Sequence, residues 1–272
     1  MPADPQNATV TARDDLAPGL AVVRVAYKHN PVPDFTPGQY TTLGLTTQLP
    51  TNTPNGNPPK RPKLVRRAYS IASAPRTKDH IEFFIVQVDD GQLTPSLFDL
   101  YPGDDLFMDP RIKGQFTLDP VPPDQTLVMV ATGTGLAPYL SMYRQFKDLP
   151  PGQRPWKHLV VLHGSRLAQD LGYHDELQTA AAHDPSLTYL ATTTREPDDS
   201  PWTGLRGRVT EHLHPDRFHD LTGLPLDPQN THVFLCGNPD MIDQAEAELT
   251  PLGFSTHTPR NPTGNLHFER YW

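Results

Sequence analysis

Short apolar runs separated by glycine and proline turns fill the first half of the chain, residues 1–122. The runs are rich in β-branched and aromatic residues and lie at positions 21–27, 39–45, 68–72 and 81–88. Turn pairs such as Pro37-Gly38 and Pro102-Gly103 stand between them. Many short strands with such turns predict a small antiparallel β-barrel.

In the second half, residues 123–272, apolar runs alternate with segments long enough for helices. The runs lie at positions 127–131, 158–162, 187–191 and 233–236, and a last strand is expected at 265–269. This alternation predicts βα units and a doubly wound parallel sheet. Ligands of such sheets bind at the carboxyl ends of the strands, so the residues that follow each run are candidates for a site.

Composition narrows the function classes. A chain of 272 residues can form one large or two modest domains. Its single cysteine excludes a disulfide framework and a cysteine-ligated iron–sulfur cluster within the chain. The formal net charge of -8 argues against general nucleic-acid binding. No apolar run reaches bilayer length, and the first residues lack a basic region followed by an apolar one, so we expect a cytoplasmic protein without membrane attachment.

The stretch from Val128 to Pro138 joins a buried strand to a helix through a glycine turn. Gly133 and Gly135 permit a tight turn and a close approach of a ligand to the backbone. Pro138 suits the first turn of the helix, whose free N–H groups can receive a pyrophosphate. An ordinary strand–turn–helix corner would have the same pattern, and Pro138 stands where the dinucleotide fingerprint has its third glycine.

A second informative stretch is Arg67-Ala-Tyr-Ser70 in a predicted strand. Alternation places Arg67 and Tyr69 on one face and Ala68 and Ser70 on the other. An arginine fork, a flat aromatic ring and a hydroxyl suit a ligand that carries both a phosphate and a ring system. The alternative is an exposed strand with a surface arginine.

Two further features concern anions. Thr94-Pro-Ser-Leu97 predicts a helix start with a capping threonine, which is either a second anion site or a helix that merely packs. Arg166, Arg195 and Arg208 follow strand ends of the predicted parallel sheet. Together they could clamp a phosphate dianion, and an arginine near an adenine ribose favours the phosphorylated dinucleotide; individually each could be a surface ion pair.

In this order, the motifs resemble the ferredoxin–NADP reductase family, and more closely its bacterial members. The resemblance covers nearly the whole chain and rests on five segments: Phe35-Thr-Pro-Gly-Gln-Tyr40, Arg67-Ala-Tyr-Ser70, Gly133-Thr-Gly-Leu-Ala-Pro138, Cys236-Gly-Asn-Pro239 and Phe268-Glu-Arg-Tyr-Trp272. It implies an FAD-binding β-barrel domain over 1–122 and an NADP-binding α/β domain over 123–272.

The resemblance also implies roles toward FAD. Arg67 should contact the pyrophosphate, Tyr69 should pack on the isoalloxazine, and the Ser70 hydroxyl should lie near the hydride-accepting N5. Thr94 and its helix start should add donors to the pyrophosphate. Further FAD contacts are expected from Ala68, Phe84, Ile85, Val86, Gly91, Leu93, Thr132, Tyr271 and Trp272.

On the NADP side, the resemblance implies that Gly133, Thr134 and Gly135 face the dinucleotide. Arg166, Arg195 and Arg208 should hold the 2′-phosphate, helped by Thr194. Cys236 and Gly237 should lie beside the nicotinamide, with the cysteine lining the site rather than acting as a nucleophile. Glu269 matches a family carboxylate near the flavin. Tyr271 should be a movable ring on the flavin, and Trp272 should pack on the adenine of a bent FAD.

The implied function is an NADPH-linked flavoprotein reductase, a monomer that exchanges electrons between NADP(H) and ferredoxin or flavodoxin through FAD. Such acidic partners would need a local basic patch, for which Lys60, Arg61, Lys63 and Arg66 or Arg144 and Lys147 are candidates. One alternative is an NADH-linked reductase component for an oxygenase or a cytochrome; another is a nucleotide-sensing module without turnover. Histidines such as His163, His212 and His214 lack a zinc-ligand spacing, and no Gly-x-Ser-x-Gly elbow occurs, so we expect no metal site and no hydrolytic chemistry.

Overall fold

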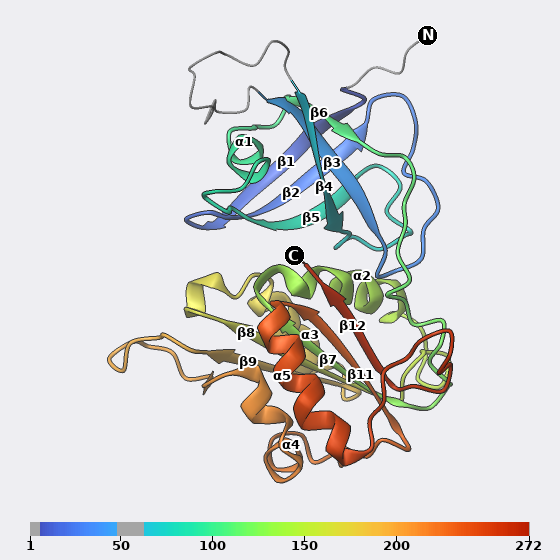
Figure 1. Ribbon diagram of the computed structural model, residues 1–272. Helices are drawn as coiled ribbons and strands as arrows, with labels where there is room; N and C mark the ends of the chain where they lie inside the picture. The colour runs from blue at the N-terminus through green and yellow to red at the C-terminus, as the bar shows by residue number, and fades with distance from the viewer. Residues whose placement is uncertain (1–5, 48–62, 272) are drawn as a thin grey trace, which may run out of the picture. The chain divides into compact units, whose positions relative to one another are not determined.

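The computed structural model describes residues 6–47 and 63–271, which form two compact units that divide after Gln115. We call them unit 1 and unit 2, and each contains one six-stranded sheet (Figure 1). In the described part of the chain, no helix has the length and apolar character needed to cross a membrane.

Unit 1 is an antiparallel β-barrel, as expected from the sequence. Its strands are β1 (Ala8–Ala17), β2 (Leu20–Tyr27), β3 (Tyr40–Thr47), β4 (Lys63–Ser70), β5 (Ile81–Val86) and β6 (Asp105–Met108). They pair in the order β4-β3-β6-β1-β2-β5. Beyond β4, the Ala72 N–H donates to the Glu82 carbonyl of β5 over 2.8 Å, so the two ends of this order are joined. Fully buried side chains such as Val25, Leu43 and Phe83 fill the interior.

The predicted strands of unit 1 correspond to β2, β3, β4 and β5, but the predicted run at 68–72 overlaps only the end of β4. Two strands were missed. In β1 only Ala8 and Val10 are buried, while its second half is polar and largely exposed, so it carries no apolar run. Strand β6 has only four residues. Such strands form because their neighbours offer backbone partners, which a single-sequence pattern does not reveal.

Unit 2 contains the predicted parallel sheet. Its strands are β7 (Thr126–Thr132), β8 (His158–Ser165), β9 (Leu187–Thr193), β10 (Leu205–Arg206), β11 (Thr231–Gly237) and β12 (Leu266–Arg270). They pair in parallel in the order β10-β9-β8-β7-β11-β12. The two-residue strand β10 was missed, because two residues carry no periodic signal.

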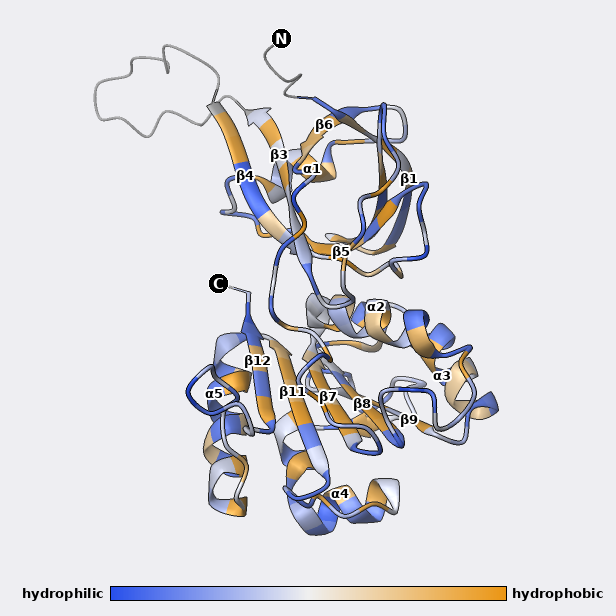
Figure 2. Ribbon diagram, turned by 90° about the vertical axis from the view of Figure 1, so that its right-hand side faces the viewer, coloured by the Kyte–Doolittle hydropathy of each residue, from blue (hydrophilic) through white to orange (hydrophobic). Residues whose placement is uncertain are grey.

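Helices cover both faces of this sheet (Figures 1 and 2). They are α2 (Ala137–Phe146), α3 (His174–His183), α4 (Pro215–Thr222) and α5 (Pro239–Leu249). Phe218 of α4 and Ile242 of α5 pack into one core cluster with Val128 and Val160 of the sheet. Because both faces are covered, the inner strands are buried at almost every position, and Figure 2 shows hydrophobic colour along much of β7, β8 and β11.

The chain order identifies the ligand edge of unit 2. From β7 the chain moves outward through β8, β9 and β10, and then returns to the other side of β7 with β11. The topological switch point therefore lies between β7 and β11, where doubly wound sheets bind ligands beyond the carboxyl ends of their strands. Thr132 ends β7 there, and Cys236-Gly237 ends β11.

Candidate functional site

The glycine turn after β7 lies directly against the end of β11. Gly133–Leu136 form a short 3₁₀ turn that leads into α2, and Pro138 stands in the first turn of that helix as predicted. A Cβ on Gly135 would collide with the Cys236 carbonyl, and one on Gly237 would collide with Thr132. The Thr132 hydroxyl accepts the Asn238 N–H over 2.9 Å. Two backbone segments thus meet without side chains between them.

Gly133 has a different environment. Its φ of +53° lies in the left-handed region, and a Cβ built on it would meet no heavy atom within 4 Å. The space beside its backbone is therefore open, as a bulky ligand that approaches the turn would require. This open space makes the turn compatible with the expected dinucleotide.

The two glycines give a paired prediction. Gly135→Ala should destabilise unit 2 by about 3 kcal/mol, because its Cβ meets backbone that cannot move without displacing β11. Gly133→Ala should cost only about 1–2 kcal/mol, the penalty for an L-residue in the left-handed region. Urea denaturation of both variants measures the difference, and equal losses would contradict the close packing at Gly135.

Three arginines stand at the ends of three adjacent strands. Arg166 follows β8, Arg195 lies two residues beyond β9, and Arg208 lies two residues beyond β10. In a parallel sheet these ends share one edge, and neighbouring strands lie roughly 5 Å apart. All three side chains are exposed, and among the described residues none of the three guanidinium groups has a polar or charged partner. We call this set the arginine cluster.

Backbone bonds hold the loops that carry the arginine cluster. The Arg195 N–H donates to the Arg166 carbonyl over 2.8 Å, which ties the β8 and β9 loops together. The Thr194 hydroxyl donates to the Ser165 carbonyl over 3.3 Å. By contrast, the nearby Arg206 has its guanidinium bound to the carbonyls of Glu196 and Pro197. The loops are therefore fixed while the cluster's charges stay available to a ligand.

Cys236, Glu269 and Tyr271 come together at the end of β11 and β12. Cys236 is fully buried and lies opposite Glu269 in the strand register. Burial, followed by the charge of Glu269, raises the pKa of the Cys236 thiol well above its usual value. The thiol is thus protonated at neutral pH, which does not suit a nucleophile. The Tyr271 hydroxyl interacts with this thiol and donates to the Thr134 carbonyl over 3.2 Å.

In unit 1, Arg67, Tyr69 and Ser70 occupy the last part of β4. The exposed Arg67 side chain donates to the Arg66 carbonyl and to Gln92 Oε1, each over 2.7 Å. Tyr69 lies edge-on to Phe83 with ring centroids 6.4 Å apart, and burial raises its phenol pKa. Ser70 is buried, and Ala68 is exposed.

The segment after β5 supplies the other expected FAD residues. Ile85 and Leu93 belong to the core cluster of the barrel, while Phe84 is buried outside that cluster and Val86 at the end of β5 is half-buried. A Cβ on Gly91 would lie 2.7 Å from both Thr94 Oγ1 and the Val88 carbonyl, so this loop closes tightly on itself.

One expectation for this segment is wrong. Thr94 does not cap α1 (Thr94–Phe98); it is the first helical residue, and the capping position is held by Leu93 without a side-chain bond. The Thr94 hydroxyl instead bonds to the N–H and the carbonyl of Val88, over 3.0 and 3.1 Å. The Thr94 hydroxyl therefore closes the 88–94 loop and does not cap the N–H groups of α1.

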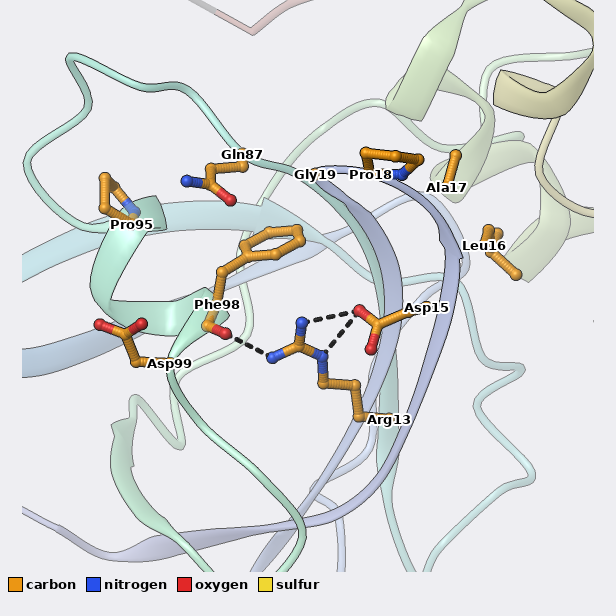
Figure 3. Close-up of a pocket in the computed structure, with 10 residues that line it drawn as sticks. All are labelled: Arg13, Asp15, Leu16, Ala17, Pro18, Gly19, Gln87, Pro95, Phe98 and Asp99. Carbon is orange, nitrogen blue, oxygen red and sulfur yellow. Dashed lines mark hydrogen bonds and ion pairs between the residues drawn. The ribbon is translucent and has the colours of Figure 1, made fainter.

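A hollow of about 370 Å³ on unit 1 is a separate feature (Figure 3). Arg13 crosses it, paired with Asp15 at 2.7 Å and bonded to the Phe98 carbonyl at 2.6 Å. None of the residues expected to bind FAD lines this hollow. The internal partners of Arg13 also leave little charge for an anionic ligand, so the hollow does not belong to the candidate site.

Some supporting residues had no signal in the sequence. Gln92 accepts from Arg67, and Thr192 donates to the Gly207 carbonyl over 2.8 Å just before Arg208. Both act through contacts between distant segments, and only the fold reveals them. Expectations for Trp272, Lys60 and Arg61 lie outside the described residues. No group of three or more His, Cys, Asp or Glu residues in the described part of the chain could hold a metal ion.

Comparison with known proteins agrees with this geometry. A family model described as the oxidoreductase NAD-binding domain matches residues 129–247, all within unit 2. The flavodoxin/ferredoxin–NADP reductase of Escherichia coli (strain K12) is 35% identical over 245 residues, 90% of this chain and 90% of that protein. The chain belongs to the flavodoxin/ferredoxin–NADP reductase family. The resemblance inferred from the motifs is therefore confirmed, and the protein is an oxidoreductase.

Other members of this family give the same picture. The ferredoxin–NADP reductase of Pseudomonas aeruginosa is 30% identical over 250 residues, 89% of this chain and 88% of that protein. A solved ferredoxin NADP+ reductase from Neisseria gonorrhoeae, with bound FAD and NADP, has a TM-score of 0.80 at 24% identity and covers 97% of this chain and 98% of that one. The two-domain fold of the reductases is thus present over the whole described chain.

Proposed function

We propose that this protein is an NADPH-linked flavoprotein reductase that exchanges electrons between NADP(H) and ferredoxin or flavodoxin through FAD. The observation that carries the proposal is the arginine cluster at one edge of the nucleotide-binding sheet. Its three guanidinium groups are exposed and have no polar or charged partner among residues 6–47 and 63–271. A ribose 2′-phosphate is a dianion, and arginine forks recognise it with charge-assisted hydrogen bonds. NADP(H) carries this phosphate and NAD(H) does not.

On unit 2, we assign the adenosine half of NADP(H) to the arginine cluster, with Thr194 beside it. The other half belongs to the switch point, where Gly133, Thr134 and Gly135 offer backbone groups. Cys236 and Gly237 bound this region from β11, and the protonated Cys236 thiol contributes an apolar, unreactive wall. Thr132 supports the end of β11 through its bond to the Asn238 N–H.

On unit 1, the flavin is assigned to the end of β4 and the 84–94 segment. Arg67 supplies a cation for the pyrophosphate, Tyr69 a flat ring for the isoalloxazine, and Ser70 a hydroxyl near N5. When bound, FAD accepts a hydride at N5 and passes the electrons on one at a time, which no side chain of this protein can do. The chain's own part is to bind, orient and shield the reacting rings.

Tyr271 and Glu269 complete the proposal on unit 2. The Tyr271 hydroxyl bonds to the glycine turn through the Thr134 carbonyl. We assign this side chain the role of a movable cover that leaves when nicotinamide enters, because a ring over the turn and a bound nicotinamide would compete for one place. Glu269, half-buried beside Cys236, is the carboxylate of the site.

The electron partner is assigned to an acidic protein, ferredoxin or flavodoxin, met by a monomer in the cytoplasm. Of the two basic patches considered for docking, the one that contains Arg144 is the less suitable. The Arg144 guanidinium makes a bidentate pair with Glu176, over 2.8 and 2.5 Å, and its charge is satisfied there. Arg66 remains exposed on the barrel, with its guanidinium 4.2 Å from the centre of the Phe107 ring, and favours docking on unit 1.

Anaerobic titration of the purified protein tests the proposal. NADPH should bleach the flavin absorbance at near-stoichiometric amounts, and oxidised ferredoxin or flavodoxin should then restore it. NADH at the same concentration should act far more slowly. A colourless protein that takes up no added FAD would overturn the proposal, while a faster response to NADH would favour a reductase component for an oxygenase or a cytochrome.

A further inference from the structure

A buried histidine contacts the glycine turn from within the sheet. His163 lies in β8, opposite Ala131 of β7, and no part of it is exposed. Its Nε2 lies 3.1 Å from the Gly133 carbonyl oxygen, and its Nδ1 lies 3.4 Å from the Tyr189 hydroxyl. That hydroxyl is in turn 3.3 Å from Nδ1 of His174 in α3. A chain of polar contacts therefore runs from α3 through the sheet to the turn.

The chemistry of these groups determines the direction of every hydrogen bond in the chain. Burial lowers the pKa of His163 to about 4, so the ring is neutral at pH 7 and carries one N–H. A carbonyl only accepts, so this N–H is on Nε2 and donates to Gly133. His163 Nδ1 then accepts from the Tyr189 hydroxyl, whose oxygen accepts from His174 Nδ1.

The contact adds to the 3₁₀ turn in orienting the peptide between Gly133 and Thr134. Gly133 adopts a left-handed φ with open space beside it, and glycine can leave such a conformation at low cost. In a trans peptide the Gly133 carbonyl and the Thr134 N–H point to opposite sides. A carbonyl held toward β8 therefore directs the N–H away from β8, whereas a flipped peptide would present a carbonyl oxygen to an anionic ligand.

We infer that His163 is a positioning residue that holds the Gly133 peptide in the orientation needed for the dinucleotide, with Tyr189 and His174 fixing its tautomer. This role rests on the proposed function, because it presupposes that the turn receives the non-adenosine half of NADP(H). His163 itself touches no ligand and acts only through the Gly133 carbonyl.

Binding of NADP+ and of 2′,5′-ADP by titration calorimetry, with full-length holoprotein, separates this role from general stability. The shorter ligand carries the group assigned to the arginine cluster but lacks the half assigned to the turn. His163→Leu should weaken NADP+ binding about tenfold, because it removes the imidazole N–H that holds the Gly133 carbonyl, and should leave 2′,5′-ADP binding within about twofold. His163→Gln keeps an N–H donor of similar reach and should restore NADP+ affinity to within about threefold of the wild type.

Two further variants sharpen the test. Tyr189→Phe removes the donor to His163 Nδ1 and should give a smaller loss of NADP+ affinity, about threefold. The matched control is His232→Leu, which also removes a buried histidine, but at the opposite end of the sheet, where its Nδ1 faces His267 Nε2 at 3.0 Å. This control should lower thermal stability and change neither affinity.

The outcomes are distinct. Unchanged NADP+ binding in His163→Leu, or equal weakening of both ligands, would overturn the positioning role, and so would failure of His163→Gln to restore binding. If the wild-type protein binds neither ligand, the proposed function itself fails. Selective weakening with rescue by glutamine would support the inference.

Discussion

Simultaneous replacement of Arg166, Arg195 and Arg208 by alanine should lower kcat/KM for NADPH by about 10³-fold. A hydrogen bond to a charged group is worth about 1.5–3 kcal/mol, and no residue in the described part of the chain pairs with the three guanidinium groups and competes for the phosphate. Neighbouring contributions overlap, so about 4 kcal/mol is a reasonable total for the cluster. The loss should appear mainly in KM, because the 2′-phosphate takes no part in the chemical step.

The same triple variant should use NADH within about threefold of the wild type, because NADH has no 2′-phosphate to lose. The matched control is Arg206→Ala. Arg206 ends β10, two residues before Arg208, but its guanidinium is bound to the carbonyls of Glu196 and Pro197, so its removal should change either kcat/KM by less than about threefold. Steady-state dye reduction with both coenzymes measures all of these values. A parallel fall with NADPH and NADH would mean that the arginine cluster supports the fold rather than the phosphate.

The sheet of unit 2 could be predicted because its inner strands are buried on both faces. Val128–Ala131 within β7 and the β11 residues Val233–Cys236 are apolar at successive positions, a signal that does not depend on partners. Unit 1 was harder, since its strands β1 and β6 carry no long continuous apolar run. In β1 the exposed residues outnumber the buried ones, and β6 is too short for a pattern, so both form through the pairing that their neighbours impose.

The candidate site, too, could be predicted from the sequence only in part. The sequence pattern placed Arg166, Arg195 and Arg208 at strand ends, because the sequence alone shows which residues follow a buried apolar run. It did not reveal that Arg144 is paired with Glu176, or that the Thr94 hydroxyl turns back to Val88. These contacts join segments that are far apart in the sequence or lie in loops, and no hydrophobic pattern in the sequence relates them. His163 is the extreme case: as a single histidine in a strand it predicts a core position, and only the fold brings its ring to the Gly133 carbonyl.

Unit 2 should lose stability in mild acid because several of its histidines are buried as neutral rings. Burial lowers the pKa of His163 and of His232 to about 4 and that of His267 to about 3, with additional repulsion among neighbouring histidine charges. Unfolded histidine has a pKa near 6.5. As the pH falls below 6.5 the unfolded chain gains protons that the folded unit does not, so stability is present above about pH 6.5 and is lost as the pH approaches 4.

The expected size follows from these values. His163 alone should contribute a loss of about 2.5 kcal/mol between pH 7 and pH 4.5, and His232 and His267 should add to this loss. Carboxylates act outside this range. Burial acts to raise the pKa of Asp184, but hydrogen bonds from Ser186 and Arg154 outweigh it and hold the pKa below its usual value. Its contribution to stability is therefore lost only below about pH 4.

The positions of the tryptophans allow this acid sensitivity to be measured for unit 2 alone. Trp156 and Trp202 lie in unit 2, and no tryptophan lies in unit 1, so the fluorescence of Trp156 and Trp202 reports the unfolding of unit 2. Urea denaturation followed by tryptophan fluorescence at pH 7 and pH 4.5 gives the two free energies. The His267→Phe variant keeps an aromatic ring against Phe234, where the wild-type rings stack with centroids 4.3 Å apart, and removes one titrating group. It should reduce the loss between the two pH values by about 1–2 kcal/mol, whatever its stability at pH 7. An identical pH dependence in variant and wild type would show that this buried imidazole is not responsible for the acid sensitivity.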